Sequence, residues 1–245
     1  MPQKHSDECI IRSFDPYLKG ELFDPSLIYY GFNSSKCLTS RIKAIVDASK
    51  NNSVLHIGCA DHPPLIEAKI SSNTWLHKLL TDNSRYCLGI DLSEEGLDKC
   101  RDLGYHNVEL VDILDPNSSI PLPSNGIYDF AILGEILEHV PDPCLFLGKL
   151  RSKLLEKCKK LLITVPNSVY YKNFIYALSC KECINSDHRY YFSPNTISKI
   201  LCDAGYHDIS IKFVSGRVPR FNIPKNFFSS RFPMLRETLV VTATL

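Results

Sequence analysis

The feature that most constrains the fold of this chain is a regular alternation of short apolar runs with helical patterns. The runs occupy residues 53–58, 86–91, 107–112, 128–133 and 160–165. Each run is nearly continuous in apolar residues, which is typical of parallel strands that are covered on both faces. Strands that alternate with helices in this way predict an open α/β sheet with helices on both sides.

Helical patterns lie between and after these runs. Residues 64–80, 143–157 and 194–204 have helical spacing, and Ser93 and Ser193 stand where N-cap residues are expected. Two further apolar runs predict closing strands at 206–213 and 237–245. The order of elements therefore predicts a doubly wound α/β fold.

Composition excludes several classes of protein. The 28 basic and 27 acidic residues give a net charge of +1, which argues against a dedicated nucleic-acid binder. No stretch approaches the ~18 apolar residues that a membrane-spanning helix needs. The first 30 residues contain no long apolar run, so no secretory signal is visible. We therefore expect a cytoplasmic protein.

The ten cysteines are scattered along the chain. Only Cys180 and Cys183 have a spacing typical of metal ligands, and no second pair completes a structural zinc site. Reduced thiols in a cytoplasm are the simpler interpretation.

Three successive strand ends carry residues suited to a nucleoside. Gly58 ends the first run, and a residue without Cβ allows a ligand to approach the backbone closely. Asp91 ends the second run and can accept hydrogen bonds from both ribose hydroxyls. Asp112 ends the third run and can accept from an exocyclic amine such as that of adenine. Their order predicts a nucleoside-type cofactor.

These segments resemble the ordered motifs of class I S-adenosylmethionine-dependent methyltransferases. The matching stretches are V-L-H-I-G-C (54–59), G-I-D (89–91), V-D-I (111–113), Y-D-F-A-I-L-G-E-I-L-E-H-V (128–140) and L-L-I-T-V-P-N (161–167). The resemblance implies a Rossmann-like, seven-stranded sheet that is mostly parallel with an antiparallel last strand. It also implies a methyltransferase domain over 34–245 and S-adenosylmethionine as cofactor.

The same resemblance assigns the cofactor site. Gly58 is expected beside the methionine part, Asp91 on the ribose and Asp112 near the adenine. The cofactor-binding residues that it implies are His56, Gly58, Cys59, Asp91, Leu92, Asp112, Ile113 and Gly134. A dinucleotide dehydrogenase is disfavoured, because no G-x-G-x-x-G follows the first run.

The first motif departs from the usual family pattern of an acid followed by three spaced glycines. His56 replaces the acid, and Ala60 and His62 replace the later glycines. The stretch L-H-I-G-C-A-D-H-P with W-L-H at 75–77 is similar to a bacterial subgroup among surface-glycan biosynthesis enzymes. His56 cannot accept the methionine ammonium as a carboxylate does.

A Glu-x-x-Glu-His segment follows the fourth run. On a helical turn Glu135, Glu138 and His139 would share one face, and His188, far along the chain, could reach the same strand end. Two carboxylates with imidazoles suit Mg²⁺, Mn²⁺, Fe²⁺ or Zn²⁺. The segment resembles those of small-RNA 2′-O-methyltransferases and ubiquinone-pathway O-methyltransferases, which implies that Glu138, His139 and His188 are catalytic. The alternative is that His139 acts without metal, as a general base or as a packing residue.

Three segments bear on the acceptor. Two are rich in aromatic residues: 1–33, an expected N-terminal cap segment, and 168–192, an expected substrate lid. Both could instead pack on the core without touching a substrate. From Lys212 to Arg236 there are six basic residues and no acidic one, which is either a solvated edge or a clamp for an acceptor phosphate.

These observations favour an S-adenosylmethionine-dependent O-methyltransferase acting on a sugar, a sugar nucleotide or another small hydroxylated metabolite, with or without a metal. Two alternatives stay open: a catalytically silent methyltransferase-like partner subunit, and an RNA ribose 2′-O-methyltransferase. The sequence does not fix the oligomeric state.

Overall fold

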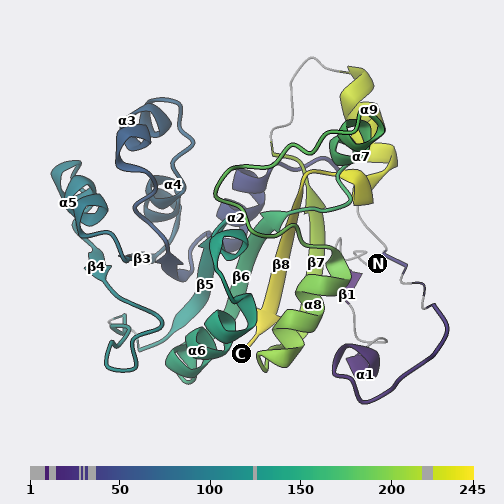
Figure 1. Cartoon of the computed structure of the whole chain (residues 1–245). Coiled ribbons are helices and arrows are strands. Elements are labelled where there is room, and N and C mark those ends of the chain that lie inside the picture. The colour runs from purple at the N-terminus through teal and green to yellow at the C-terminus, as the bar shows by residue number, and fades with distance from the viewer. Residues whose placement is uncertain are drawn as a thin grey trace, which may run out of the picture.

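The computed structural model describes residues 9–10, 15–27, 29, 31–32, 37–123, 126–216 and 223–245. Its centre is one sheet with the order β1-β7-β8-β6-β5-β2-β3-β4 (Figure 1). The strands are β1 (Cys9–Ile10), β2 (Ser53–Ile57), β3 (Tyr86–Asp91), β4 (Val108–Leu110), β5 (Tyr128–Gly134), β6 (Cys158–Pro166), β7 (His207–Val214) and β8 (Thr238–Thr244).

The expected Rossmann-like sheet is confirmed. β2 is parallel to both β3 and β5, β3 is parallel to β4, and β5 is parallel to β6. β8 is antiparallel to both β6 and β7, as expected of the last strand. The short β1 adds an eighth strand, antiparallel to β7, which the sequence did not indicate.

Helices cover both faces of this sheet. The α-helices are α1 (Asp15–Leu18), α2 (Arg41–Ser49), α3 (Pro63–Ser71), α4 (Leu76–Asn83), α5 (Glu94–Asp102), α6 (Pro143–Leu154), α7 (Tyr171–Leu178), α8 (Pro194–Asp203) and α9 (Ile223–Arg231). The described residues also form two 3₁₀ turns, η2 (Leu137–His139) and η3 (Pro233–Leu235). In Figure 1, α6 and α8 lie side by side in front of the sheet, and α7 and α9 lie together at its upper end.

The core explains why the strands are apolar throughout. Successive residues of a strand point to opposite faces. Val54 packs in one cluster with Ile45 and Leu80 from α2 and α4. Leu55 packs in another with Leu147 and Leu201 from α6 and α8, among other residues. Because helices cover both faces of the sheet, a strand with polar residues at every second position would bury them against a helix.

Caps and breaks decide where the helices begin and end. Ser93 and Ser193 are N-caps whose hydroxyls accept hydrogen bonds from the backbone N–H groups of Gly96 and Thr196, as expected. The expectation of one helix over 64–80 is wrong. The chain forms α3 and α4 there, separated by a turn in which Asn73 has a φ of +53°. Such a left-handed residue cannot lie inside a right-handed helix.

The described part of the N-terminal segment lies at the β7 edge. Leu18 is buried in the core, and the rings of Phe32 and Phe213 meet edge to face at 5.9 Å. Phe23 and Tyr29 are exposed. Phe14 and Tyr30 lie outside the described residues. None of the described helices has the length and apolar character needed to cross a bilayer.

Candidate active site

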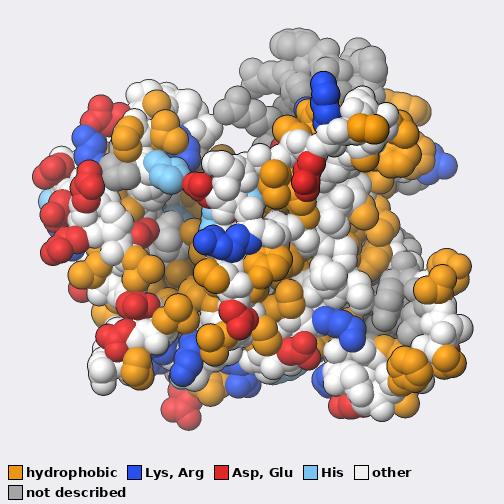
Figure 2. All heavy atoms as spheres, viewed as in Figure 1, with side chains coloured by type: hydrophobic (Ala, Val, Ile, Leu, Met, Phe, Trp, Pro, Cys, Tyr) orange, Lys and Arg blue, Asp and Glu red, His pale blue; other side chains and the backbone are white. Residues whose placement is uncertain are grey.

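A cleft of about 1660 Å³ opens at the carboxyl ends of the parallel strands. This is the end at which ligands bind in open α/β sheets, and the volume exceeds the ~300–1,000 Å³ of a typical small-molecule pocket. In Figure 2 histidine side chains border the hollow between the surface over α3 and α4 and the surface over α7 and α9. Every residue expected to contact cofactor or metal lines the cleft except Glu138: His56, Gly58, Cys59, Asp91, Leu92, Asp112, Ile113, Gly134, Glu135, His139 and His188.

The turn after β2 requires glycine at position 58 and lies at the edge of the cleft. Gly58 has a φ of +73°, and a Cβ there would collide with the side chain of Ile136. The backbone N–H groups of Gly58 and Cys59 both donate to the carbonyl of Ile90, at 2.8 and 3.2 Å. Only glycine combines this φ with such close packing without strain, so the turn lies directly against the side chain of Ile136.

The two expected aspartates are held by backbone donors. Asp91 Oδ2 accepts from the N–H of Ala60 at 2.9 Å, and Oδ1 accepts from the N–H of Ser93 at 3.0 Å. Asp112 Oδ1 accepts from the N–H of Leu114 at 2.7 Å. A carboxylate oxygen can accept two hydrogen bonds. Both aspartates line the cleft, and their carboxylates retain capacity for further hydrogen bonds.

His56, which replaces the acid of the first motif, is paired with another histidine. Its Nδ1 lies 3.3 Å from Nδ1 of His77, and the two rings stack with centroids 5.4 Å apart. The pKa of His56 lies well below its usual range, because burial disfavours the imidazolium and His77 and Arg41 repel it. Burial also lowers the pKa of His77, to about 4. The pair is therefore neutral at physiological pH.

Glu138, His139 and His188 come together beyond the end of β5. One ligand atom from each lies within 4.8 Å of the others. His188 Nε2 is 4.0 Å from Glu138 Oε1, and the two imidazole rings meet edge to face at 4.7 Å. His139 Nδ1 lies 3.2 Å from the carbonyl oxygen of Asp187. A carbonyl can only accept, so Nδ1 of His139 donates this hydrogen bond.

Glu138 is the unusual member of this group. Its side chain has no exposed surface, and neither carboxylate oxygen has a hydrogen-bond partner. Burial raises the pKa of Glu138 to about 8, with a contribution from the charge of Glu135. A buried carboxylate without partners costs several kcal/mol unless a cation balances it. The donor set of one carboxylate and two imidazoles suits a divalent transition metal.

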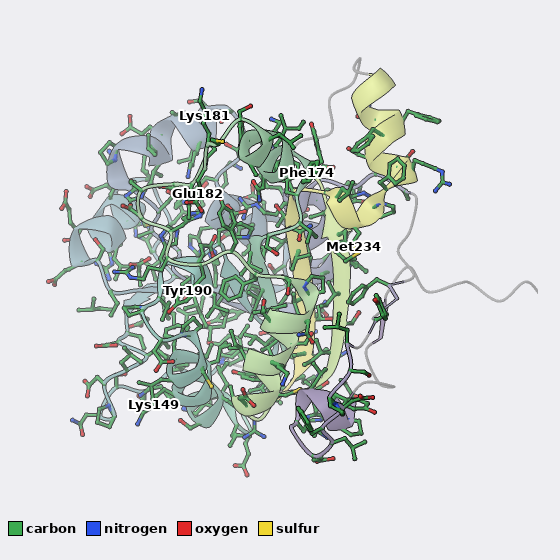
Figure 3. All side chains as sticks on the ribbon, turned by 45° about the vertical axis from the view of Figure 1, so that its right-hand side comes forward. Lys149, Phe174, Lys181, Glu182, Tyr190 and Met234 are labelled. Atoms are coloured by element: carbon green, nitrogen blue, oxygen red, sulfur yellow. The ribbon has the colours of Figure 1, made fainter. Side chains whose placement is uncertain are left out.

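The segment that carries His188 is fastened to the turn that carries His139. The backbone N–H of Arg189 donates to the carbonyl of Glu138 at 2.8 Å, and the Arg189 side chain donates to the carbonyl of His139. The hydroxyl of Tyr190, labelled in Figure 3, donates to the carbonyl of Pro141 at 2.8 Å. These bonds hold residues 188–190 against residues 138–141, although the two segments are far apart in sequence.

Glu135 does not join this group. The expected helical turn starts later, as the 3₁₀ turn Leu137–His139, and Glu135 has a φ of +60°. Its carboxylate lies 3.3 Å from Nε of Arg41, at the start of α2. Sequence reasoning missed Arg41, because no local motif connects it to a strand end that lies far along the chain.

Segment 168–192 contributes one wall of the cleft. Tyr170, Lys172, Asn173, Tyr176 and Tyr191 all face it. α7 exposes the apolar side chains of Phe174, Ile175 and Leu178, and Phe174 is labelled in Figure 3. The rings of Tyr171 and Phe228 join α7 to α9 at 5.3 Å. No described residue of 1–33 lines the cleft.

The basic residues between Lys212 and Arg236 do not line this cleft where they are described. Arg236 is buried and donates to the carbonyls of Ser229 and Phe213. The Arg231 guanidinium lies 5.4 Å from the ring centroid of Phe232. Arg217 and Arg220 lie outside the described residues, as does the side chain of Lys225. The phosphate clamp stays a prediction.

Solved structures share this fold. A methyltransferase from Thermotoga maritima, described as a possible histamine N-methyltransferase, is 15% identical with a TM-score of 0.53, over 84% of this chain and 87% of that one. A methyltransferase from Mesorhizobium loti is 14% identical with a TM-score of 0.51, over 82% and 96%. The small RNA methyltransferase HEN1 is 16% identical with a TM-score of 0.50, over 91% of this chain and 27% of that one.

A search of curated proteins finds no match to this sequence. The family model described as "Methyltransferase domain" matches residues 33–211, which is most of the chain and includes the strand ends described above. The chain therefore belongs to the methyltransferase-domain family, and it is an S-adenosylmethionine-dependent methyltransferase.

Proposed function

We propose that this protein is a metal-assisted O-methyltransferase acting on a small hydroxylated acceptor, with Glu138, His139 and His188 as metal ligands. The observation that carries the proposal is the Glu138 carboxylate, which is buried, lacks hydrogen-bond partners and lies beside two imidazoles. A carboxylate in this position is otherwise a destabilising feature.

The chemistry follows from what each group can do. Bound S-adenosylmethionine supplies an electrophilic methyl group, and a bound divalent ion lowers the pKa of an acceptor hydroxyl. Glu138 would provide the negative charge that holds the ion. The hydrogen bond from Nδ1 of His139 to the carbonyl of Asp187 fixes the orientation of the ring. Nε2 then remains available as a metal ligand. Without an ion, the same nitrogen could accept the proton of the acceptor.

Segment 168–192 is proposed as a lid over the acceptor, since its polar and aromatic side chains form one wall of the cleft. Tyrosines together with Lys172 and Asn173 provide stacking surfaces and hydrogen-bond donors suited to a sugar or sugar nucleotide. The link to surface polysaccharide synthesis, and the wider subgroup assignment, rest on the resemblance of the first motif alone.

Metal titration tests the proposal. Chelator-treated protein is titrated with Mn²⁺ and the free ion is measured by electron paramagnetic resonance. We expect one site in the wild type and a loss of more than tenfold in affinity for Glu138→Gln. The exposed residue Glu109 provides the control Glu109→Gln, which should bind as the wild type does.

Activity is tested with radiolabelled methyl donor against sugar nucleotides, small phenols and short RNAs. Full turnover after chelation would overturn the metal role and leave His139 as a base. Transfer to RNA alone would favour the ribose methyltransferase. If the wild type binds no S-adenosyl ligand, the silent partner subunit becomes the better interpretation.

A further inference from the structure

Helix α7 carries apolar side chains that the protein does not bury. Six of its eight residues are apolar or aromatic, and none of the eight is buried. Tyr171, Phe174, Ile175 and Leu178 stand at i, i+3, i+4 and i+7, so they share one side of the helix. Tyr171 packs against the ring of Phe228 in α9, whereas Phe174 and Leu178 are 68% and 72% exposed. The apolar stripe therefore continues beyond the contact that joins α7 to α9.

The apolar surface extends over α9 and the residues that follow it. Phe227 is 71% exposed, and the rings of Phe228 and Phe232 lie 5.0 Å apart. In Figure 2 hydrophobic side chains gather over α7 and α9, at the upper right, with basic side chains beside them. A large exposed apolar patch on a protein commonly marks an interaction site. Six exposed side chains form what we call the α7–α9 patch: Phe174, Ile175, Leu178, Phe227, Phe232 and Met234.

The charged residues of the two segments that carry the patch are all basic. Residues 168–181 and 223–236 contain five basic residues and no acidic one, although the whole chain has 27 acidic residues. Lys181, just after α7, and Arg231, at the end of α9, are exposed. Acidic residues resume at Glu182 and at Glu237, whose carboxylate accepts a hydrogen bond from a backbone N–H at 3.0 Å. The patch is therefore apolar with basic residues at its border, which complements a surface that is apolar inside and anionic outside.

The patch adjoins the cleft without belonging to it. Lys172, Asn173 and Tyr176 of α7 line the cleft, whereas none of the six patch residues does. One side of α7 thus borders the site and the other side meets solvent. α9 projects from the upper end of the molecule in both Figure 1 and Figure 3. Its apolar side chains can therefore reach a flat surface beside the cleft.

We propose that the α7–α9 patch docks on an anionic lipid bilayer. The apolar side chains of an amphipathic helix enter the boundary between head groups and acyl chains, and nearby Lys and Arg side chains are attracted to anionic lipids. The docked protein would hold the mouth of the cleft at the membrane, within reach of hydroxylated lipid head groups. That consequence rests on the proposed transfer to a hydroxyl group, whereas docking itself depends on neither the acceptor nor the metal.

Vesicle flotation tests the docking without reference to activity. The full chain is mixed with vesicles of phosphatidylcholine alone, or with vesicles in which about one third of the lipid is phosphatidylglycerol, and the bound fraction gives a partition coefficient. We expect the wild type to bind the anionic vesicles at least about tenfold more strongly than the neutral ones. Added salt should weaken this binding, because it screens the attraction between the basic side chains and the lipid.

Substitutions in the patch assign the binding to it. Phe174→Ser and Phe227→Ser each remove an exposed ring and should weaken binding to anionic vesicles about tenfold. Lys181→Gln and Arg231→Gln should each weaken it about fivefold. Phe23 offers a matched control, because its ring is 89% exposed and it follows α1, at the lower end of the molecule in Figure 1. Phe23→Ser should bind within about twofold of the wild type, and all five variants should keep the wild-type Tm, since the changed side chains are exposed.

Three results would overturn the docking proposal. They are wild-type protein that does not bind anionic vesicles, equal binding to neutral and anionic vesicles, and an effect of Phe23→Ser as large as that of Phe174→Ser. Light scattering tests a second copy of the chain as the occupant: a dimer that Phe174→Ser dissociates, without vesicle binding, would assign the patch to self-association. Vesicle binding without methyl transfer to any hydroxylated acceptor would refute the proposed function and leave the docking intact.

Discussion

At the scale of single residues, the His56–His77 pair shows how one substitution changes the chemistry of a strand end. An acid at position 56 would have to be exposed or paired, whereas an imidazole can be buried against a second ring. Gly89 makes room for this arrangement, since a Cβ there would lie 2.7 Å from both His77 Cε1 and Cys59 Sγ. The cost is a buried titratable pair that must stay neutral.

That cost predicts a pH dependence of stability. Unfolded histidine takes up a proton near pH 6.5, whereas folded His77 does so only near pH 4, because burial lowers its pKa. Between these values the unfolded state binds more protons, so the free energy of unfolding falls as the pH falls. The slope is up to about 1.4 kcal/mol per pH unit for each such histidine.

The variant His77→Gln should reduce this slope. Urea unfolding at intervals from pH 6.5 to 4.5 measures it, and the exposed residue His106 gives a matched control in His106→Gln. An unchanged slope in His77→Gln would show that the pair does not remain neutral in the folded protein.

At the scale of elements, Asn167 connects β6 to the start of the proposed lid. Its side-chain amide donates to the carbonyls of Met234 and Arg236, at 2.9 and 2.6 Å, and its Oδ1 accepts from the N–H of Val169. The residue is buried. It therefore joins the entry to α7 with the segment that leads into β8.

Asn167→Ala should lower the free energy of unfolding by about 2–3 kcal/mol, because it leaves buried carbonyls without donors. Hydrogen exchange in 168–178 should also accelerate. Asn173→Ala, at a half-buried residue whose bonds are 3.3 and 3.4 Å long, should cost less than about 1 kcal/mol. Equal losses in the two variants would contradict this role of Asn167.

The elements also show how far sequence can predict structure. The strands were predictable, because burial on both faces demands apolar runs of limited length, and β3 begins and ends at the residues expected. Ser93 and Ser193 were predictable because capping is local. The Glu135 turn was not predictable, because a left-handed φ is uncommon for a residue other than glycine and Glu135 gives no local signal of it. The spacing of Glu135, Glu138 and His139 alone suggested a helical face that the chain does not form.

At the scale of the whole molecule, the cleft is built from segments that span residues 38–238. Some residues that line the cleft follow local sequence patterns, whereas others are brought together by tertiary contacts. The turns after β2, β3 and β4 follow local patterns, so Gly58, Asp91 and Asp112 could be chosen from the sequence. The pairing of Arg41 with Glu135 depends on tertiary contacts, which no spacing rule reports.

This arrangement predicts that a metal stabilises the entire protein. An ion bound by Glu138, His139 and His188 would join the turn after β5 to the proposed lid. A ligand at a hundred times its dissociation constant stabilises the folded state by about 2.7 kcal/mol. For a protein of this size, that corresponds to a rise in Tm of roughly 5–10 °C.

Differential scanning calorimetry with Mn²⁺ should show this rise in the wild type and in Glu109→Gln. Glu138→Gln should show no more than about half of this rise, since the buried carboxylate supplies the charge that holds the ion. An equal rise in Glu138→Gln would place the ion elsewhere.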